Sequence, residues 1–229
     1  MKLYIDDVRT EKLKELIDLY PVDGVTSNPS VLMRGGRPPV EVLKEIRCMI
    51  GPEKMLMAQV ISTQAEDMIR EAHRLMEILG ADGENYFVKL PANPQGIKAI
   101  KALSAEGIRC NATGIYSVAQ GLLAANAGAL AMATYISRID NLGGDGMKVT
   151  RDMQAILNAY PDYRAQIIPG SIKTVQQVVE CAKAGIAGVA VSVDVWERFM
   201  QNACVDAAID GFNRDFEALC GEGRTFLDL

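Results

Sequence analysis

The sequence has a single histidine, no closely spaced pair of cysteines and no long apolar run. With only His73, a zinc or iron site built mainly on imidazole ligands is not available, which disfavours metal-dependent aldolase or hydrolase chemistry. The five cysteines lie far apart and form no CxxC motif, which predicts reduced thiols and a cytoplasmic location. No run approaches the roughly 18 apolar residues of a membrane span, so we expect no membrane partner.

A surplus of basic residues is also missing. The net charge is −5 and the charged residues are interspersed, which argues against a nucleic-acid partner because such a partner needs a clustered basic surface. A small anionic substrate stays compatible with this charge, since a pocket needs only a few local cations. Hydrophobic residues make up 49% and charged residues 23%, as in ordinary globular proteins. No linker-like stretch divides the chain, so we predict one domain that spans residues 1–229.

Short apolar runs alternate with segments of helical periodicity along the chain. These runs are apolar on both faces, which is typical of parallel strands that are buried on two sides. They lie at residues 3–5, 24–26, 55–60, 86–90, 108–110, 130–134, 166–168 and 188–193. Eight strand-then-helix units favour an α/β fold, a closed (β/α)8 TIM barrel, with an additional C-terminal helix at about residues 205–219.

Capping residues mark where several of the predicted helices begin. Thr63 is followed three residues later by Glu66, a capping-box pattern, so we expect a helix to begin there. Asn93 precedes a proline at the first position of another helix, and Thr174 opens a later one. The glycine-rich residues 143–146 lack the spacing of a dinucleotide-binding loop, and we interpret them as a turn before a helix.

Polar residues collect where the predicted strands end. In a barrel of parallel strands the active site lies at this rim, because the loops from strand to helix begin there. The candidates for a functional site are Asp6, Thr26, Asn28, Gln59, Lys89, Thr113, Tyr135, Arg138, Ser171 and Lys173. Each has a plain structural explanation by itself, but their joint placement predicts a site.

Lys89 is the most informative of these residues. It lies between Val88 and Leu90 in a strand that should be buried, and burial of an unpaired ammonium lowers its pKa. The neutral amine is the form that attacks a carbonyl to give a Schiff base. The competing interpretation is a lysine that pairs with a carboxylate, such as Asp6, across the barrel.

Four other candidates suit the proton transfers of Schiff-base aldol chemistry. Asp6 could accept the proton of a substrate hydroxyl, whereas Gln59, Thr113 and Tyr135 could hold a water or donate a proton to the enamine carbon. An amide such as that of Gln59 in an apolar strand needs buried partners. Tyr135 taken alone is also typical of an aromatic residue at a barrel mouth.

Arg138, Ser171 and Lys173 predict a phosphate site. An arginine, a hydroxyl and a lysine at neighbouring strand ends, followed by a capped helix, match the anion site that follows the late strands of many barrels. The competing interpretation is a set of surface charges that form salt bridges.

Several stretches together resemble the transaldolase family, and within it the fructose-6-phosphate aldolase-like subgroup. GVTSNPS at residues 24–30 resembles the N-terminal signature of the family, and FVKLP at residues 87–91 resembles the signature around its Schiff-base lysine. Further similarity runs through residues 106–108, 116–123, 135–144 and 171–174, so it covers nearly the whole chain in order.

The resemblance implies a class I aldolase that needs no metal or organic cofactor. It implies a homopentamer or homodecamer in which the C-terminal helix contacts a neighbouring subunit. It also implies that Lys89 binds the dihydroxyacetone unit, that Asp6 handles the hydroxyl proton and that Thr113 positions the catalytic water. Thr26 and Asn28 would bind substrate, Asn28 through a donor hydroxyl, and the three residues of the predicted anion site would bind the phosphate of a sugar phosphate.

Two positions indicate the subgroup. The sequence resembles the aldolase-like subgroup at Gln59 and Tyr135, whereas transaldolases typically have glutamate and phenylalanine at these two positions. A phenol beside the enamine offers a proton and so favours release of free dihydroxyacetone. We therefore predict cleavage of fructose 6-phosphate to dihydroxyacetone and glyceraldehyde 3-phosphate, or the reverse. The alternatives are a transaldolase, including one that uses a sulfo-sugar, and a non-catalytic sugar-phosphate-binding protein.

The sequence departs from the subgroup beside the predicted water and anion sites. Pro169 and Gly170 precede Ser171 where relatives have two alanines, and Thr134 replaces a usual proline. Residues 110–112, CNA, are also unusual. These departures leave open a substrate other than fructose 6-phosphate, such as another sugar phosphate or a sulfonated sugar.

Overall fold

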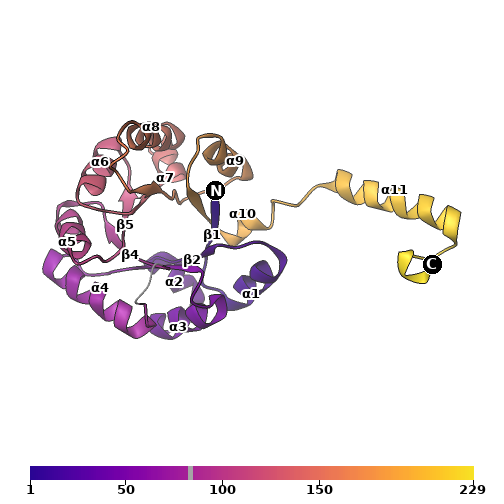
Figure 1. The fold of residues 1–229 in the computed structure, drawn as a ribbon, viewed down its shortest axis with the longest axis horizontal. Helices are drawn as coiled ribbons and strands as arrows, with labels where there is room; N and C mark the ends of the chain where they lie inside the picture. The colour runs from indigo at the N-terminus through magenta and orange to yellow at the C-terminus, as the bar shows by residue number, and fades with distance from the viewer. Residues whose placement is uncertain (82–84) are drawn as a thin grey trace. The chain divides into compact units, whose positions relative to one another are not determined.

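A computed structural model of the protein describes residues 1–81 and 85–229 (Figure 1). They form two compact units, Met1–Trp196 and Glu197–Leu229. In the first unit a ring of helices surrounds parallel strands whose order is β7-β6-β5-β4-β3-β2-β1-β8 (Figure 1). The strands are β1 (Lys2–Asp6), β2 (Gly24–Thr26), β3 (Met55–Gln59), β4 (Tyr86–Pro91), β5 (Cys110–Ile115), β6 (Ala131–Thr134), β7 (Gln166–Ile167) and β8 (Gly188–Val191).

The sheet closes on itself between its two outer strands. β1 pairs in parallel with both β2 and β8, so the first and last strands of the barrel are neighbours. On the other side of β8, the amide of Ala190 donates a hydrogen bond to the carbonyl of Pro169, two residues after β7, at 2.9 Å. The predicted (β/α)8 barrel is therefore confirmed.

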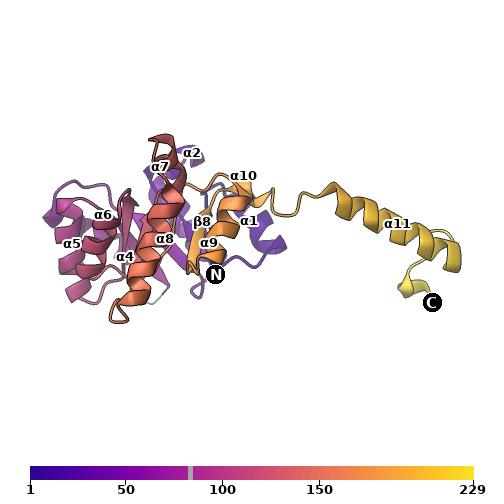
Figure 2. The ribbon, with the colours of Figure 1, turned by 90° about the horizontal axis from the view of Figure 1, so that it is seen from above.

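Helices alternate with the strands, and two of their predicted starts are confirmed. Asn93 accepts a hydrogen bond from the amide of Gly96 at 2.8 Å, and Thr174 forms a capping box with Gln177. The helices of the first unit are α1 (Thr10–Leu19), α2 (Pro29–Gly35), α3 (Pro39–Ile50), α4 (Ala65–Leu79), α5 (Pro94–Ala105), α6 (Val118–Asn126), α7 (Ile136–Asn141), α8 (Gly146–Ala159), α9 (Val175–Lys183) and α10 (Val193–Trp196). The helices α8 and α9 lie side by side in both views (Figures 1 and 2).

The predicted start of a helix at Thr63 was wrong, because α4 begins at Ala65 without a side-chain cap. Other groups satisfy the backbone there. The carboxylate of Glu71 accepts hydrogen bonds from the amides of Ile61 and Ser62, both at 2.8 Å, and Gln95 accepts one from the amide of Ala65. Glu71, which lies further along α4 itself, thus binds the backbone just before the helix, and Glu66 forms no capping box.

The predicted fifth strand was also misplaced. The structure has β5 at Cys110–Ile115 rather than at residues 108–110, so Thr113 lies inside the strand and not beyond it. Asn111 and Thr113 are buried polar residues of this strand. A continuous apolar run predicts a buried strand, and the polar alternation of β5 lacks such a run over most of its length.

The barrel interior is packed below its rim. A cluster of buried side chains fills it and consists of Tyr4, Met55, Met57, Phe87, Ala131 and Ile168. The space that remains lies at the carboxyl ends of the strands, where the cavity described below opens. This is the end at which barrels of this type bind their substrates.

The second unit contains α11 (Ala203–Cys220), close to the predicted helix at residues 205–219, and a short 3-10 helix, Phe226–Asp228. No residue of α11 is buried, and several of its apolar side chains are exposed, among them Val205, Ile209 and Phe212. Across the described parts of the chain, no helix combines the length and the apolar character needed to cross a membrane.

Candidate active site

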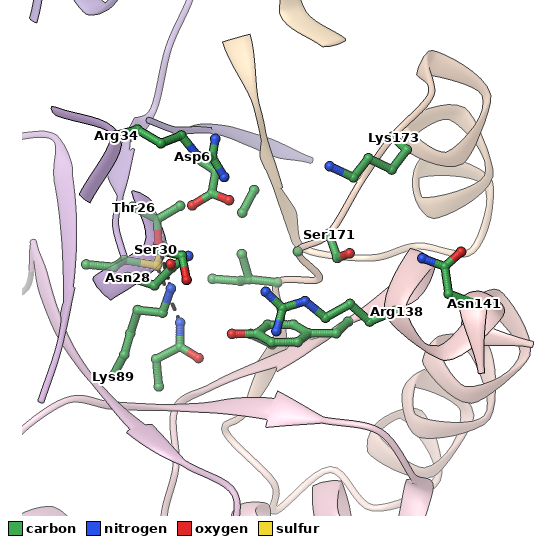
Figure 3. A pocket seen from close by; sticks show the side chains of 17 residues that line it. Asp6, Thr26, Asn28, Ser30, Arg34, Lys89, Arg138, Asn141, Ser171 and Lys173 are labelled. Atoms are coloured by element: carbon green, nitrogen blue, oxygen red, sulfur yellow. Dashed lines mark hydrogen bonds between the residues drawn. The ribbon is translucent and has the colours of Figure 1, made fainter. Parts of the chain in front are cut away.

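A cavity of about 270 Å³ opens at the carboxyl ends of the barrel strands (Figure 3). Eight of the ten candidates from the sequence line it: Asp6, Thr26, Asn28, Lys89, Tyr135, Arg138, Ser171 and Lys173. Residues from most of the barrel, far apart in the sequence, therefore meet around one space. The polar lining suits a small, highly hydroxylated and anionic molecule better than an apolar one.

Lys89 lies in β4 at the inner part of this cavity and is only 5% exposed. Its Nζ donates hydrogen bonds to Oγ1 of Thr26 and to the carbonyl of Ser27, both at 3.0 Å. Burial lowers the pKa of Lys89, and the charge of Asp6 opposes this shift. Among the described residues no ion pair with Lys89 is formed, so the structure does not favour the interpretation of a lysine paired with Asp6.

Asp6 ends β1 and is the only carboxylate among the described residues that line the cavity. Burial raises the pKa of Asp6, while the positive charges of Lys89 and then of Arg34 lower it. The neighbouring Asp7 does not line the cavity and forms an ion pair with Arg9 at 2.6 Å. Asp6 is thus placed to exchange a proton with a bound molecule.

Tyr135 follows β6, and its hydroxyl lies 3.0 Å from Oγ1 of Thr113. The guanidinium of Arg138 stacks over the tyrosine ring, 4.7 Å from its centroid. Burial raises the pKa of Tyr135, so the phenol stays protonated and can donate a proton. Thr113 does not line the cavity itself, but it is hydrogen-bonded to Tyr135, which does.

Gln59 is the candidate that the structure places elsewhere. It ends β3 but lines a separate hollow together with residues of α2, α3 and α4, not the cavity that holds Lys89. Its Oε1 is buried and has no hydrogen-bond partner among the described residues. A role of Gln59 in holding a catalytic water stays a prediction.

The three candidate phosphate ligands group at the ends of β6 and β7, away from Thr26 and Lys89 (Figure 3). Ser171 has a φ of 56°, a left-handed conformation that is uncommon for serine. The amides of Lys173 and Thr174 already donate to Oε1 of Gln177, at 2.8 and 3.3 Å. An anion here would therefore rely on the side chains of Arg138, Ser171 and Lys173 more than on the start of α9.

Four polar residues of the lining were not predicted: Ser30, Arg34, Asn111 and Asn141. Ser30, Arg34 and Asn141 lie on α2 and α7, and which side of a short helix faces the cavity depends on how it packs. Asn111 lies in the part of β5 that the apolar pattern concealed. In the described residues no group of three or more His, Cys, Asp or Glu side chains is arranged to hold a metal ion.

A closed barrel with a buried lysine at the carboxyl ends of its strands is the arrangement expected of a class I aldolase. The family model for transaldolase/fructose-6-phosphate aldolase matches residues 3–223, and the chain belongs to this family. It is accordingly an aldolase or a transaldolase of class I.

Curated relatives match over almost their full length. A "Probable transaldolase" of Caldicellulosiruptor saccharolyticus is 38% identical over 218 residues, which cover 95% of this chain and 97% of the relative. One of Lactiplantibacillus plantarum is 37% identical, and a "Probable transaldolase 2" of Listeria monocytogenes is 36% identical, with the same coverage. A solved structure named "Native KDPGal structure" superposes with a TM-score of 0.55 over 82% of this chain and 81% of the other, at 15% identity. This last likeness concerns the fold alone.

Proposed function

We propose that the protein is a Schiff-base aldolase that cleaves fructose 6-phosphate to dihydroxyacetone and glyceraldehyde 3-phosphate, or forms it from them. The observation that supports this most is the buried amine of Lys89, which faces a polar cavity and, within the described part of the chain, is hydrogen-bonded to neutral oxygens only. Such an amine is poised to be neutral and nucleophilic.

The proposed reaction begins with attack of the Lys89 amine on the C2 carbonyl and loss of water, which gives an iminium ion. Asp6 accepts the proton of the C4 hydroxyl while the C3–C4 bond breaks, and the electron pair of that bond moves into the iminium to form an enamine. Glyceraldehyde 3-phosphate leaves. Tyr135, held by Thr113, supplies a proton to C3 of the enamine, and water then hydrolyses the resulting iminium to release dihydroxyacetone and the Lys89 amine. The proton that Asp6 accepted returns to Tyr135 through water, which restores both groups.

The second candidate function is transaldolase activity, which the names of the curated relatives favour. In that reaction the enamine is not protonated and attacks a second aldehyde. Incubation with fructose 6-phosphate, with and without erythrose 4-phosphate, separates the two. We expect glyceraldehyde 3-phosphate to be released without any acceptor, and strict dependence on erythrose 4-phosphate would contradict the aldolase proposal.

The phosphate ligands lead to a prediction for Arg138→Met. We expect the KM for glyceraldehyde 3-phosphate to rise about 10–100-fold, because hydrogen bonds to charged groups contribute about 1.5–3 kcal/mol. The KM for unphosphorylated glyceraldehyde should change little, and steady-state kinetics with both aldehydes measure this. Arg151→Met, which removes a half-exposed arginine of α8 outside the cavity, is the matched control. Equal effects on both aldehydes would contradict a phosphate role for Arg138.

We also propose that the protein assembles as a homopentamer or homodecamer in the cytoplasm. The exposed apolar residues of α11, spaced by about one helical turn, support an assembly in which this helix packs on another subunit. The cysteines are all unpaired, which supports a reducing compartment.

A further inference from the structure

Arg34 is a cation of the cavity that the reaction proposed above does not use. It lies on α2, one helical turn after Ser30, and both side chains line the cavity. Asn28 fixes the start of this short helix, because its side chain accepts a hydrogen bond from the amide of Val31 at 3.1 Å. Arg34 is exposed and forms no ion pair with another described residue. The fold therefore brings its charge to the cavity without a partner that neutralises it.

The charged side chains of the cavity divide into two sets. Arg138 and Lys173 lie on one side, whereas Arg34 lies on the other side (Figure 3). Arg34 is next to Asp6 there (Figure 3). A phosphate monoester carries a charge of about −1.5 to −2 near neutral pH, which the first two cations balance. Lys89 attacks as a neutral amine, so among the described residues of the lining Asp6 and Arg34 are the charges that remain, one of each sign.

Asp6 needs such a counter-charge, since only its ionised form can accept the proton of the C4 hydroxyl. It is only partly exposed, and burial raises its pKa. The positive charges of Lys89, then of Arg34 and finally of Lys173 lower this pKa. When the Lys89 amine is neutral, its contribution is lost and Arg34 becomes the largest positive charge that acts on Asp6. The titratable and charged side chains that interact with Asp6 are Asp7 directly after β1, Arg34 on α2, Lys89 on β4, Tyr135 after β6 and Lys173 after β7.

We infer that Arg34 is a positioning residue whose charge keeps Asp6 ionised while the Lys89 amine is neutral, so that the carboxylate is ready to accept the C4 hydroxyl proton. This inference rests on the proposed Schiff-base reaction. Arg34 acts through its charge, since no hydrogen bond joins these two described side chains. A lysine at position 34 should therefore replace it, whereas a neutral side chain should not. Without the charge the pKa of Asp6 rises, and more of the enzyme is protonated and inactive on the acid side of its pH profile.

The test measures the pH profile of kcat/KM for fructose 6-phosphate, from about pH 5 to about pH 9, in the wild type, Arg34→Gln and Arg34→Lys. Formation of glyceraldehyde 3-phosphate is followed with erythrose 4-phosphate present, so cleavage is measured whether the donor unit is released or transferred. We expect the activity of Arg34→Gln on the acid side, relative to its own plateau, to fall about threefold or more below that of the wild type. Arg34→Lys should restore the profile of the wild type. Ionisation of the substrate phosphate is common to all variants.

Arg37→Gln is the matched control. Arg37 is an exposed arginine that follows α2, forms an ion pair with Glu45 at 2.7 Å and does not line the cavity. Its loss should leave the pH profile unchanged. The profile depends on the state of the free enzyme, so it distinguishes a group that acts on Asp6 from one that only contributes to folding.

Three results would overturn the role of Arg34. They are an Arg34→Gln profile equal to that of the wild type, a rise of KM that is the same at every pH, which indicates direct binding of substrate, and an Arg34→Lys variant that behaves as Arg34→Gln. Borohydride trapping of dihydroxyacetone on Lys89, measured by peptide mass, separates these results from failure of the proposed function. A wild type that neither traps the donor nor cleaves fructose 6-phosphate contradicts the proposed function and this inference together.

Discussion

Lys89→Met is expected to abolish turnover, with a loss of at least about 10⁴-fold, while the barrel stays folded. Methionine has a similar length but no amine, so no Schiff base can form. The change also removes a buried group whose charged form is costly, although Thr26 and Ser27 lose the donor of their hydrogen bonds. We therefore expect only a small change in melting temperature. Turnover of fructose 6-phosphate and circular dichroism measure the two effects.

A matched control for this variant is Lys98→Met. Lys98 is an exposed lysine of α5 that forms an ion pair with Glu66 and does not line the cavity, so its loss should leave turnover intact. Borohydride reduction with dihydroxyacetone should attach the donor to the wild type and to Lys98→Met, but not to Lys89→Met. Turnover that survives in Lys89→Met would refute the mechanism. A folded wild type that binds fructose 6-phosphate but gains no mass would instead favour a non-catalytic binding protein.

Tyr135→Phe should change the balance of products rather than stop the chemistry. Without the phenol the enamine loses its proton donor, and general acid catalysis typically contributes 10²–10⁴-fold. We expect release of free dihydroxyacetone to fall about 100-fold, while transfer of the same unit to erythrose 4-phosphate is kept. Product analysis with and without this acceptor gives both rates in one set of assays.

Tyr116→Phe is the control for this experiment. The ring of Tyr116 packs edge-on against that of Tyr135, with centroids 5.8 Å apart, but it does not line the cavity. It should leave the ratio of release to transfer unchanged. If Tyr135→Phe also keeps the ratio of the wild type, another group protonates the enamine and Tyr135 has only a positioning role.

Much of the barrel could be predicted from the sequence because most of its strands are apolar on both faces. Lys89 was recognisable for the same reason, since a lysine between Val88 and Leu90 contradicts its surroundings. The apolar pattern does not predict a strand that departs from it. β5 alternates polar and apolar residues because its polar side chains, Asn111 and Thr113, are buried inside the barrel.

Which of the other residues line the cavity depends on the direction in which each side chain points. The spacing of residues along the sequence does not define that direction. Gln59 and Lys89 are partners in register at the ends of neighbouring strands, yet only Lys89 lines the cavity. Arg34 of α2 lies close to Asp6 in the lining of the cavity, which no local motif indicates (Figure 3). Contacts outside the expected motif also replaced it, as the carboxylate of Glu71 binds the chain before α4 where the spacing predicted a capping box with Glu66.

Where the barrel closes between β7 and β8, the two sides do not offer each other the same hydrogen-bonding groups. Pro169 has no amide hydrogen, so it offers β8 only a carbonyl, which accepts from Ala190. The segment that follows is fastened instead to β6 and α7, since Gly170 donates to Thr134 and the amide of Ser137 donates to the carbonyl of Ser171. On the other side of this contact β8 pairs with β1, which ends in Asp6, so the β7–β8 closure lies between the anion ligands and Asp6. A movement between β7 and β8 therefore changes the distance from the anion ligands to Asp6, whereas Lys89 stays joined to the anion ligands through β4, β5 and β6.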